Sequence, residues 1–192
     1  MRNSTVDIHP IRIGTVQRDL PVVPVSADLS IAFLKLYGDL PLVEAATTEL
    51  AARLEPGIDI IVGPETGGIL LAHKIAEKTG KPYVVARKKI RPYMRSPLSV
   101  PVSTIGTAGV QQLVLGEDDA VLLNGARVAV VDEVVSSGGT LTALGELIAK
   151  AGGRIAQTLA VATEGAPRPT VVSLCHLPLF PTDGAMAEAA QA

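Results

Sequence analysis

The sequence predicts an α/β fold in which a parallel sheet is flanked by helices, and three observations lead to it. Apolar residues make up 47% of the chain and are mainly Val, Ile, Leu and Ala, which is typical of a sheet buried on both faces. Short Val- and Ile-rich runs alternate with helical patterns, as right-handed β-α-β crossovers require. A length of 192 residues without an internal repeat or low-complexity linker indicates a single domain, residues 1–192.

The N-terminal part is predicted to be extended up to a first helix. Residues 6–25 read as short extended segments broken by Gly14, Pro21 and Pro24. From Pro41 to Leu54 the leucines and alanines recur near helical spacing, so a helix is expected there. A proline suits the first turn of a helix, and the Pro-Gly pair that follows Leu54 and Glu55 ends it.

The middle of the chain predicts two buried strands joined by a helix. The runs IDIIVG at 58–63 and PYVVAR at 82–87 are short and apolar, as buried strands are. Between them, residues 67–80 have the pattern of a helix that closes at a glycine. Residues 88–118 lose core periodicity, and we expect a long excursion there, part loop and part hairpin.

The alternation continues in the C-terminal half. A third strand is predicted at 127–134, a helix at 140–152 and a fourth strand at 154–163. The run VVSLCHL at 171–177 predicts one more edge strand. The last eleven residues have little to anchor them and are expected to fray.

Composition excludes several classes of function. The formal charge of −2 gives no broad positive field, so no nucleic-acid partner is expected. The single cysteine, Cys175, excludes an internal disulfide and a Cys-based zinc site. The polar start of the chain lacks a secretory signal, and no apolar stretch of about 18 residues or more occurs. We therefore expect a cytoplasmic protein without a membrane partner.

The stretch VAVVDEVVSSGGT, residues 128–140, carries the chemistry. A buried strand delivers Asp132 and Glu133 at its carboxyl end, the edge of a parallel sheet where ligands collect. A Ser/Gly loop follows and leads into a helix. Glycines let backbone N–H groups approach a ligand, the hydroxyls add donors, and a helix N-terminus favours an anion. This loop therefore predicts a phosphate cradle, while the two acids need another partner, such as ribose hydroxyls or a divalent cation.

This stretch resembles the phosphoribosyl pyrophosphate signature of type I phosphoribosyltransferases: a hydrophobic strand, two acids, two hydrophobic residues and a Gly-rich loop ending in Thr. The resemblance implies that Asp132 and Glu133 hold the ribose, shelter developing positive charge and bind Mg²⁺, directly or indirectly. It also implies that the loop holds the 5-phosphate. The loop residues are Val135, Ser136, Ser137, Gly138, Gly139 and Thr140.

Two upstream segments are similar to further parts of that family. IVGPETGGILLA, residues 61–72, resembles its pyrophosphate loop, with Glu65 at the usual acidic position and Thr66 and Gly67 beside it. The family often has a basic residue where this chain has Gly67, so any contact there is through the backbone. Arg87 and Lys88 resemble the basic pair that ends the next strand. In relatives this arginine can reach a neighbouring subunit, which implies a homodimer.

The resemblance also implies how the chain is divided. A core of about residues 41–165 is expected, with a small hood from about 1–40 and 166–182 and a flexible loop at about 90–112. Such loops close over substrates and exclude water. A purine needs a flat apolar face, and Phe33, Tyr93 and Phe180 lie in segments expected to form the hood.

The implied function is a purine phosphoribosyltransferase that uses phosphoribosyl pyrophosphate and Mg²⁺, acts in purine salvage and releases pyrophosphate. Hypoxanthine-guanine enzymes of the human type carry an acid where this chain has Ser136, which favours adenine as the base. Two alternatives stay open: an enzyme specific for hypoxanthine, guanine or xanthine, and a regulatory protein that binds phosphoribosyl pyrophosphate without turnover.

Overall fold

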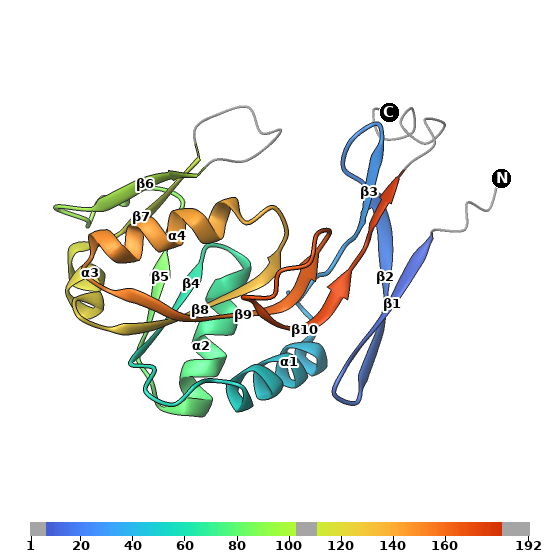
Figure 1. Cartoon of the computed structure of the whole chain (residues 1–192), viewed down its shortest axis with the longest axis horizontal. Helices are drawn as coiled ribbons and strands as arrows, with labels where there is room; N and C mark the ends of the chain where they lie inside the picture. The colour runs from blue at the N-terminus through green and yellow to red at the C-terminus, as the bar shows by residue number, and fades with distance from the viewer. Residues whose placement is uncertain (1–6, 103–110, 182–192) are drawn as a thin grey trace.

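The computed structural model describes residues 7–102 and 111–181, and its centre is a five-stranded parallel sheet (Figure 1). The strand order is β10-β9-β8-β4-β5, and all four neighbouring pairs run parallel. This confirms the predicted sheet, its buried strands and its edge strand near residue 175. The strands are β4 (Ile60–Pro64), β5 (Tyr83–Ala86), β8 (Arg127–Val135), β9 (Arg154–Glu164) and β10 (Val172–Leu177).

Helices cover both faces of this sheet. In Figure 1, α1 (Leu40–Ala52) and α2 (Gly67–Thr79) lie on one face and α4 (Gly139–Lys150) lies on the other. These three are the helices that the sequence predicts. Asp39 caps α1 by accepting a hydrogen bond from the N–H of Leu42, and Pro41 lies in its first turn. A fourth helix, α3 (Glu117–Leu123), was not predicted; it has seven residues and buries only Leu123, so it leaves no periodic pattern.

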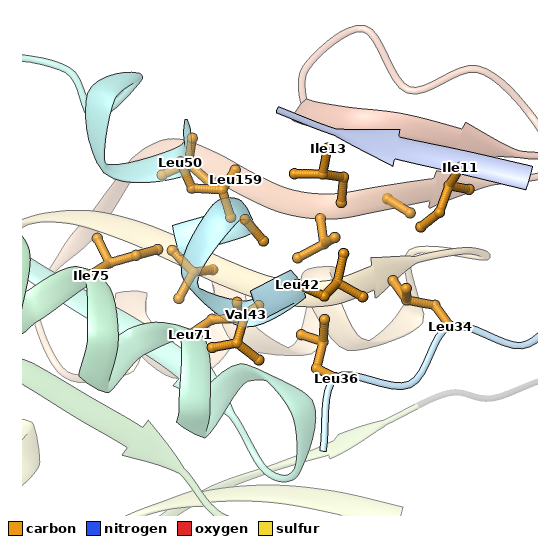
Figure 2. Close-up of a cluster of buried hydrophobic side chains, with 14 of the residues drawn as sticks. Ile11, Ile13, Leu34, Leu36, Leu42, Val43, Leu50, Leu71, Ile75 and Leu159 are labelled. Atoms are coloured by element: carbon orange, nitrogen blue, oxygen red, sulfur yellow. The ribbon is translucent and has the colours of Figure 1, made fainter. Parts of the chain in front are cut away.

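Each face of the sheet has its own hydrophobic core. One core packs α1 and α2 against the sheet and also takes in Ile11 and Ile13 from the N-terminal strand β1 (Ile8–Ile13); Figure 2 shows these side chains in one cluster with Leu42 and Leu159. The other core lies under α4. The rigid sheet between the two cores fixes where the end of β8 lies.

A second, antiparallel sheet is formed by the chain termini, in the order β1-β2-β3-β11. Its strands are β1 (Ile8–Ile13), β2 (Val16–Pro24), β3 (Leu29–Ala32) and β11 (Leu179–Pro181). The expectation that Pro21 breaks the extended segment was wrong, because β2 runs through it and ends at Pro24. Pro21 lacks an N–H group, and in the sheet its carbonyl accepts from the N–H of Phe33 at 2.9 Å.

The excursion after β5 contains the predicted hairpin. Its strands are β6 (Leu98–Val102) and β7 (Gln111–Leu115), which pair antiparallel. A bridge between Arg87 and Val114 joins this hairpin to the end of β5. Much of the flexible loop expected at 90–112, namely 103–110, lies outside the described residues, as do the terminal residues 182–192.

Candidate active site

Asp132 lies near the carboxyl end of β8, between the neighbouring strands β9 and β4. On one side β8 stays paired with β9, with Asp132 opposite Ala160. On the other side the pairing with β4 ends at Val130, so the carboxylate faces a space beyond the ladder. Its Oδ1 accepts the N–H of Glu133 at 2.8 Å. The pKa of Asp132 is raised to about 7, mainly by burial and also by the charge of Glu133, while the hydrogen bond from the Glu133 N–H and the charge of Lys88 oppose the rise.

Glu133 turns toward the segment that enters α1. Its Oε1 accepts the N–H of Leu36 at 3.1 Å, and burial raises the pKa of its carboxyl group. The side chain also fills the space over Gly67, where an ideal Cβ would lie 2.5 Å from Glu133 Oε2. A side chain at position 67 would therefore collide with Glu133 in its present position.

The loop after β8 is open to an anion. Residues 135–140 line a cavity of about 100 Å³ together with Asp132 and the first turns of α4. No backbone hydrogen bond between described residues is donated by the N–H groups of Ser137, Gly138, Gly139 or Thr140. Gly138 has φ +86°, a conformation that glycine adopts without strain. Unpartnered N–H groups at a helix N-terminus are what a phosphate group binds.

A second cavity of about 330 Å³ adjoins the first and shares Asp132, Val134 and Thr140 with it. It collects the other predicted site residues from three strand ends: Glu65, Thr66, Gly67, Lys88 and Glu133. The residues that line the two cavities extend from the loop after β8 to the loop after β4. The structure thus brings the predicted acids, phosphate loop and pyrophosphate loop to one edge of the sheet.

Glu65 organises the basic segment after β5. Its Oε2 accepts the N–H of Lys88 at 2.8 Å, and its Oε1 accepts from Arg91 Nη2 at 3.2 Å. Arg87 Nη1 lies 3.7 Å from the same Oε1. The Lys88 hydrogen bond, together with the two arginines, lowers the pKa of Glu65 below its usual value against the opposing effect of burial.

Arg87 is the predicted site residue that lines neither of these two cavities, although its Nη1 lies 3.7 Å from Glu65 Oε1. It lines a third cavity of about 680 Å³, on the other side of the strand end, with Tyr83, Tyr93 and Arg95. Three acids of α3 close this cavity: Glu117, Asp118 and Asp119.

The predicted stacking residues do not line the two cavities that contain Asp132. Phe180 packs edge-on against His9 with ring centres 5.8 Å apart, Tyr93 lines the third cavity, and Phe33 is 48% exposed. Tyr37 lies beside Asp132 and Glu133 instead. Burial raises the pKa of its phenol, and the charges of the two acids add to this. Tyr37 has no spacing signal in the sequence, because it follows a short strand that was not predicted.

The sequence did not single out two further contacts near the site. Gln111 and Gln112, at the start of β7, line the 330 Å³ cavity. Arg168, from the loop between β9 and β10, donates from Nε to the carbonyl of Ser136 at 2.5 Å. Both contacts join segments far apart in sequence, so only the folded chain reveals them.

Two further observations bear on metal and membrane binding. Within residues 7–102 and 111–181, no group of three or more His, Cys, Asp or Glu side chains could hold a metal ion. In the same part of the chain, no helix is long and apolar enough to cross a membrane.

Sequence comparison finds similar proteins with related names. An adenine phosphoribosyltransferase of Thermotoga sp. (strain RQ2) is 34% identical over 102 residues, which cover 50% of this chain and 54% of that protein. One from Alkaliphilus oremlandii is 32% identical over 115 residues, covering 57% and 61%. A hypoxanthine/guanine phosphoribosyltransferase of Methanococcus voltae is 34% identical over 124 residues, covering 65% and 63%. The chain thus spans between about half and two thirds of these relatives.

Solved structures share the fold. The adenine phosphoribosyltransferase of Rhodothermus marinus superimposes with a TM-score of 0.65 at 20% identity, covering 88% of this chain and 94% of that one. The Trypanosoma brucei enzyme, solved in complex with AMP, pyrophosphate and ribose-5-phosphate, gives a TM-score of 0.61 at 18% identity, covering 72% and 65%.

The family model described as the phosphoribosyl transferase domain matches residues 35–175, from the segment entering α1 to β10. That match includes the acids of β8, the phosphate loop and the loop after β4, and it spans well over half of the chain. The chain therefore belongs to the phosphoribosyl transferase domain family.

Proposed function

We propose that this protein is a purine phosphoribosyltransferase, with adenine as the preferred base. One observation carries the proposal: residues 137–140, whose N–H groups have no backbone partner among the described residues, line a cavity that Asp132 also lines. This arrangement presents anion donors and a sugar-binding carboxylate to one small molecule. Phosphoribosyl pyrophosphate carries both the 5-phosphate and the ribose hydroxyls that these groups bind.

The reaction displaces pyrophosphate from C1 of the ribose. A ring nitrogen of the base forms a bond to C1, the bond from C1 to the pyrophosphate oxygen breaks with its electron pair, and the base loses a proton. Positive charge develops on the ribose, and the Asp132 carboxylate, which lines this cavity, would stabilise that charge. The loop after β4 and Lys88 line the same cavity and would receive the pyrophosphate.

Mg²⁺ belongs to this proposal as an ion that arrives with the substrate. Mg²⁺ keeps several waters and is bound through one or two carboxylates together with substrate phosphates. Asp132 fits this requirement, because only its Oδ1 has a partner among the described residues. Bound there, the ion would neutralise charge on the departing pyrophosphate.

The preference for adenine rests on Ser136 and on the relatives. Ser136 places a small hydroxyl where human-type hypoxanthine-guanine enzymes have an acid. Two of the three relatives described above are named adenine phosphoribosyltransferases, and the third is a hypoxanthine/guanine enzyme. Hypoxanthine and guanine are therefore the competing bases, and xanthine stays open as a third.

We also propose that the enzyme acts as a homodimer, in purine salvage in the cytoplasm. The position of Arg87 supports the dimer, because its side chain lines a cavity separate from the one that holds Asp132. Tyr93, which lines that cavity, is 68% exposed, and Ile90, three residues before it, is 52% exposed. A second subunit would cover them and receive Arg87.

The test is a panel of bases. Purified protein is incubated with Mg²⁺, phosphoribosyl pyrophosphate and one of adenine, hypoxanthine, guanine, xanthine or orotate, and nucleotide formation is followed. We expect adenylate to form fastest. Faster formation of another purine nucleotide would overturn the choice of base. Binding of phosphoribosyl pyrophosphate without any product would overturn catalysis and favour a regulatory protein.

A further inference from the structure

Arg168 makes an unusual contact with the phosphate loop. It lies between β9 and β10, and its Nε donates to the carbonyl of Ser136 at 2.5 Å. The rest of the guanidinium lies over Gly138, where an ideal Cβ would be 2.9 Å from Nη1 and 3.2 Å from Cζ. A side chain at position 138 would therefore collide with Arg168.

The segment that carries Arg168 is itself anchored. The Arg168 carbonyl accepts the N–H of Val171 at 3.0 Å, and the N–H of Gly165 donates to Leu177 at 3.0 Å. Val171 is buried against Val135 and Ala160, next to the phosphate loop. Arg168 thus reaches the loop from a fixed base.

The contact has a geometric consequence for the neighbouring amide. In a trans peptide the carbonyl of one residue and the N–H of the next point in opposite directions. The Ser136–Ser137 bond is trans, since the single cis bond among the described residues joins Glu65 and Thr66. Because Arg168 holds the Ser136 carbonyl on its own side, the N–H of Ser137 points away from Arg168. That N–H is one of the donors without a partner among the described residues.

The positive charge of Arg168 is not paired with an acidic side chain among the described residues. None of the ion pairs within residues 7–102 and 111–181 involves Arg168. A guanidinium close to Gly138 raises the positive potential at the loop, and a phosphate monoester is the ligand that gains from it.

We propose that Arg168 is a positioning residue of the 5-phosphate site: it holds the Ser136 carbonyl, directs the Ser137 N–H toward the phosphate and supplies a compensating charge. This inference rests on the proposed function, because it assigns the 5-phosphate to the loop after β8. It predicts a ligand-specific effect. Ribose 5-phosphate contacts this loop, whereas pyrophosphate alone binds at the loop after β4 and at Lys88.

The experiment is calorimetric titration of the full chain with ribose 5-phosphate and, separately, with pyrophosphate and Mg²⁺. Arg168→Gln removes the charge and is expected to weaken ribose 5-phosphate binding by about 10- to 100-fold. Pyrophosphate affinity is expected to stay within about twofold of wild type. Arg168→Lys keeps the charge and one donor, and it is expected to bind ribose 5-phosphate with intermediate affinity. In turnover assays the KM for phosphoribosyl pyrophosphate should rise more than kcat falls.

Arg154→Gln is the matched control, because Arg154 is exposed at the opposite end of β9 and its loss changes the net charge equally. It should leave both affinities unchanged. The inference is overturned if Arg168→Gln binds ribose 5-phosphate as wild type does, or if it loses both ligands equally. Titration needs no turnover, so a wild-type chain that binds ribose 5-phosphate without making nucleotide would refute the proposed enzyme and leave this inference standing.

Discussion

Burial of the Asp132 carboxyl group at the proposed site lowers the stability of the folded protein. Its pKa rises to about 7 because the folded chain buries it, whereas the unfolded chain ionises near pH 4. Between these values the folded state holds a proton that the unfolded state has lost. Stability therefore falls as the pH rises from about 4 to 7.

Asp132→Asn should accordingly stabilise the protein, and more at high pH than at low pH. Asparagine can still accept the Glu133 N–H, but it has no charge to bury. The gain should be larger at pH 8 than at pH 5 and should stay below about 4 kcal/mol. Urea denaturation at both pH values measures it, with exposed Asp19→Asn as the control. A variant less stable than wild type at pH 8 would show that burying the ionised Asp132 carboxylate does not destabilise the folded protein.

The same side chains carry the proposed catalysis. Asp132→Asn combined with Glu133→Gln should cut turnover at least about 100-fold, because the two carboxylates that we propose hold the ribose lose their charge. Circular dichroism should show that the fold is kept. Unchanged kinetics in this double variant would mean that the site lies elsewhere.

At Gly67, packing limits which side chain the proposed pyrophosphate loop can carry. A Cβ there would lie 2.5 Å from Glu133 Oε2 and 2.7 Å from Glu133 Cβ, so Glu133 would have to move. We expect Gly67→Lys to lower the free energy of unfolding by about 1–3 kcal/mol and to slow turnover, although it adds a cation near the pyrophosphate.

Gly145→Ala is the matched control for that variant. Gly145 lies within α4, and the nearest atom to an added Cβ is 3.9 Å away, so alanine has room and favours the helix. It should be at least as stable as wild type. A Gly67→Lys variant of wild-type stability and higher activity would contradict the steric explanation.

At the scale of elements, the sequence predicted the parts of the fold that have long, regular patterns. The parallel strands and the three long helices were predicted within a few residues, because apolar runs and helical spacing report burial directly. The short elements were missed. Strands β3 and β11 have four and three residues, too few for an alternation to be read, and they become strands by pairing with each other and with β2.

Site residues that are contiguous in sequence were predicted, and those that come from distant segments were not. The acids and the phosphate loop are contiguous in sequence, so their spacing could be recognised. Tyr37 and Arg168 reach the site from segments about 95 and 30 residues away from it, and no local pattern records such contacts. Arg87 was predicted from its place after β5, but which side of the strand end it lines depends on Glu65 and α3.

One ion pair joins the N-terminal sheet to the helical layer. Arg18 of β2 donates to both carboxylate oxygens of Asp39, at 2.6 and 2.7 Å, and Asp39 also caps α1. The Arg18 hydrogen bond, opposed by desolvation and aided by the Leu42 N–H, lowers the pKa of Asp39. The carboxylate thus stabilises the fold above about pH 4, and this contribution is lost as the pH falls through its lowered pKa.

Asp39→Ala should therefore destabilise the protein at pH 7, by roughly 1 kcal/mol for the lost cap. The difference from wild type should shrink as the pH falls below about 4. Thermal unfolding across this pH range measures it, with Asp59→Ala as a second aspartate variant, at the other end of the sheet. A difference that does not depend on pH would show that the charge of Asp39 is not what matters.

At the scale of the whole molecule, the two hydrophobic cores clamp the sheet and hold three strand ends in register. The ends of β4, β5 and β8 contribute Glu65, Lys88 and Asp132 to one edge, and the helix α4 begins directly behind it. The N-terminal segment closes the edge through the Leu36–Glu133 hydrogen bond. A site of this kind depends on the order of the strands in the sheet as well as on a sequence motif. The fold and the proposed chemistry are therefore recognised together.

The most direct measurement is a crystal structure of the protein soaked with ribose 5-phosphate. The account predicts that the phosphoryl oxygens lie within hydrogen-bond distance of the N–H groups of residues 137–140, with the ribose hydroxyls directed toward Asp132. A sugar phosphate bound at another edge of the sheet, with the loop after β8 left vacant, would contradict it.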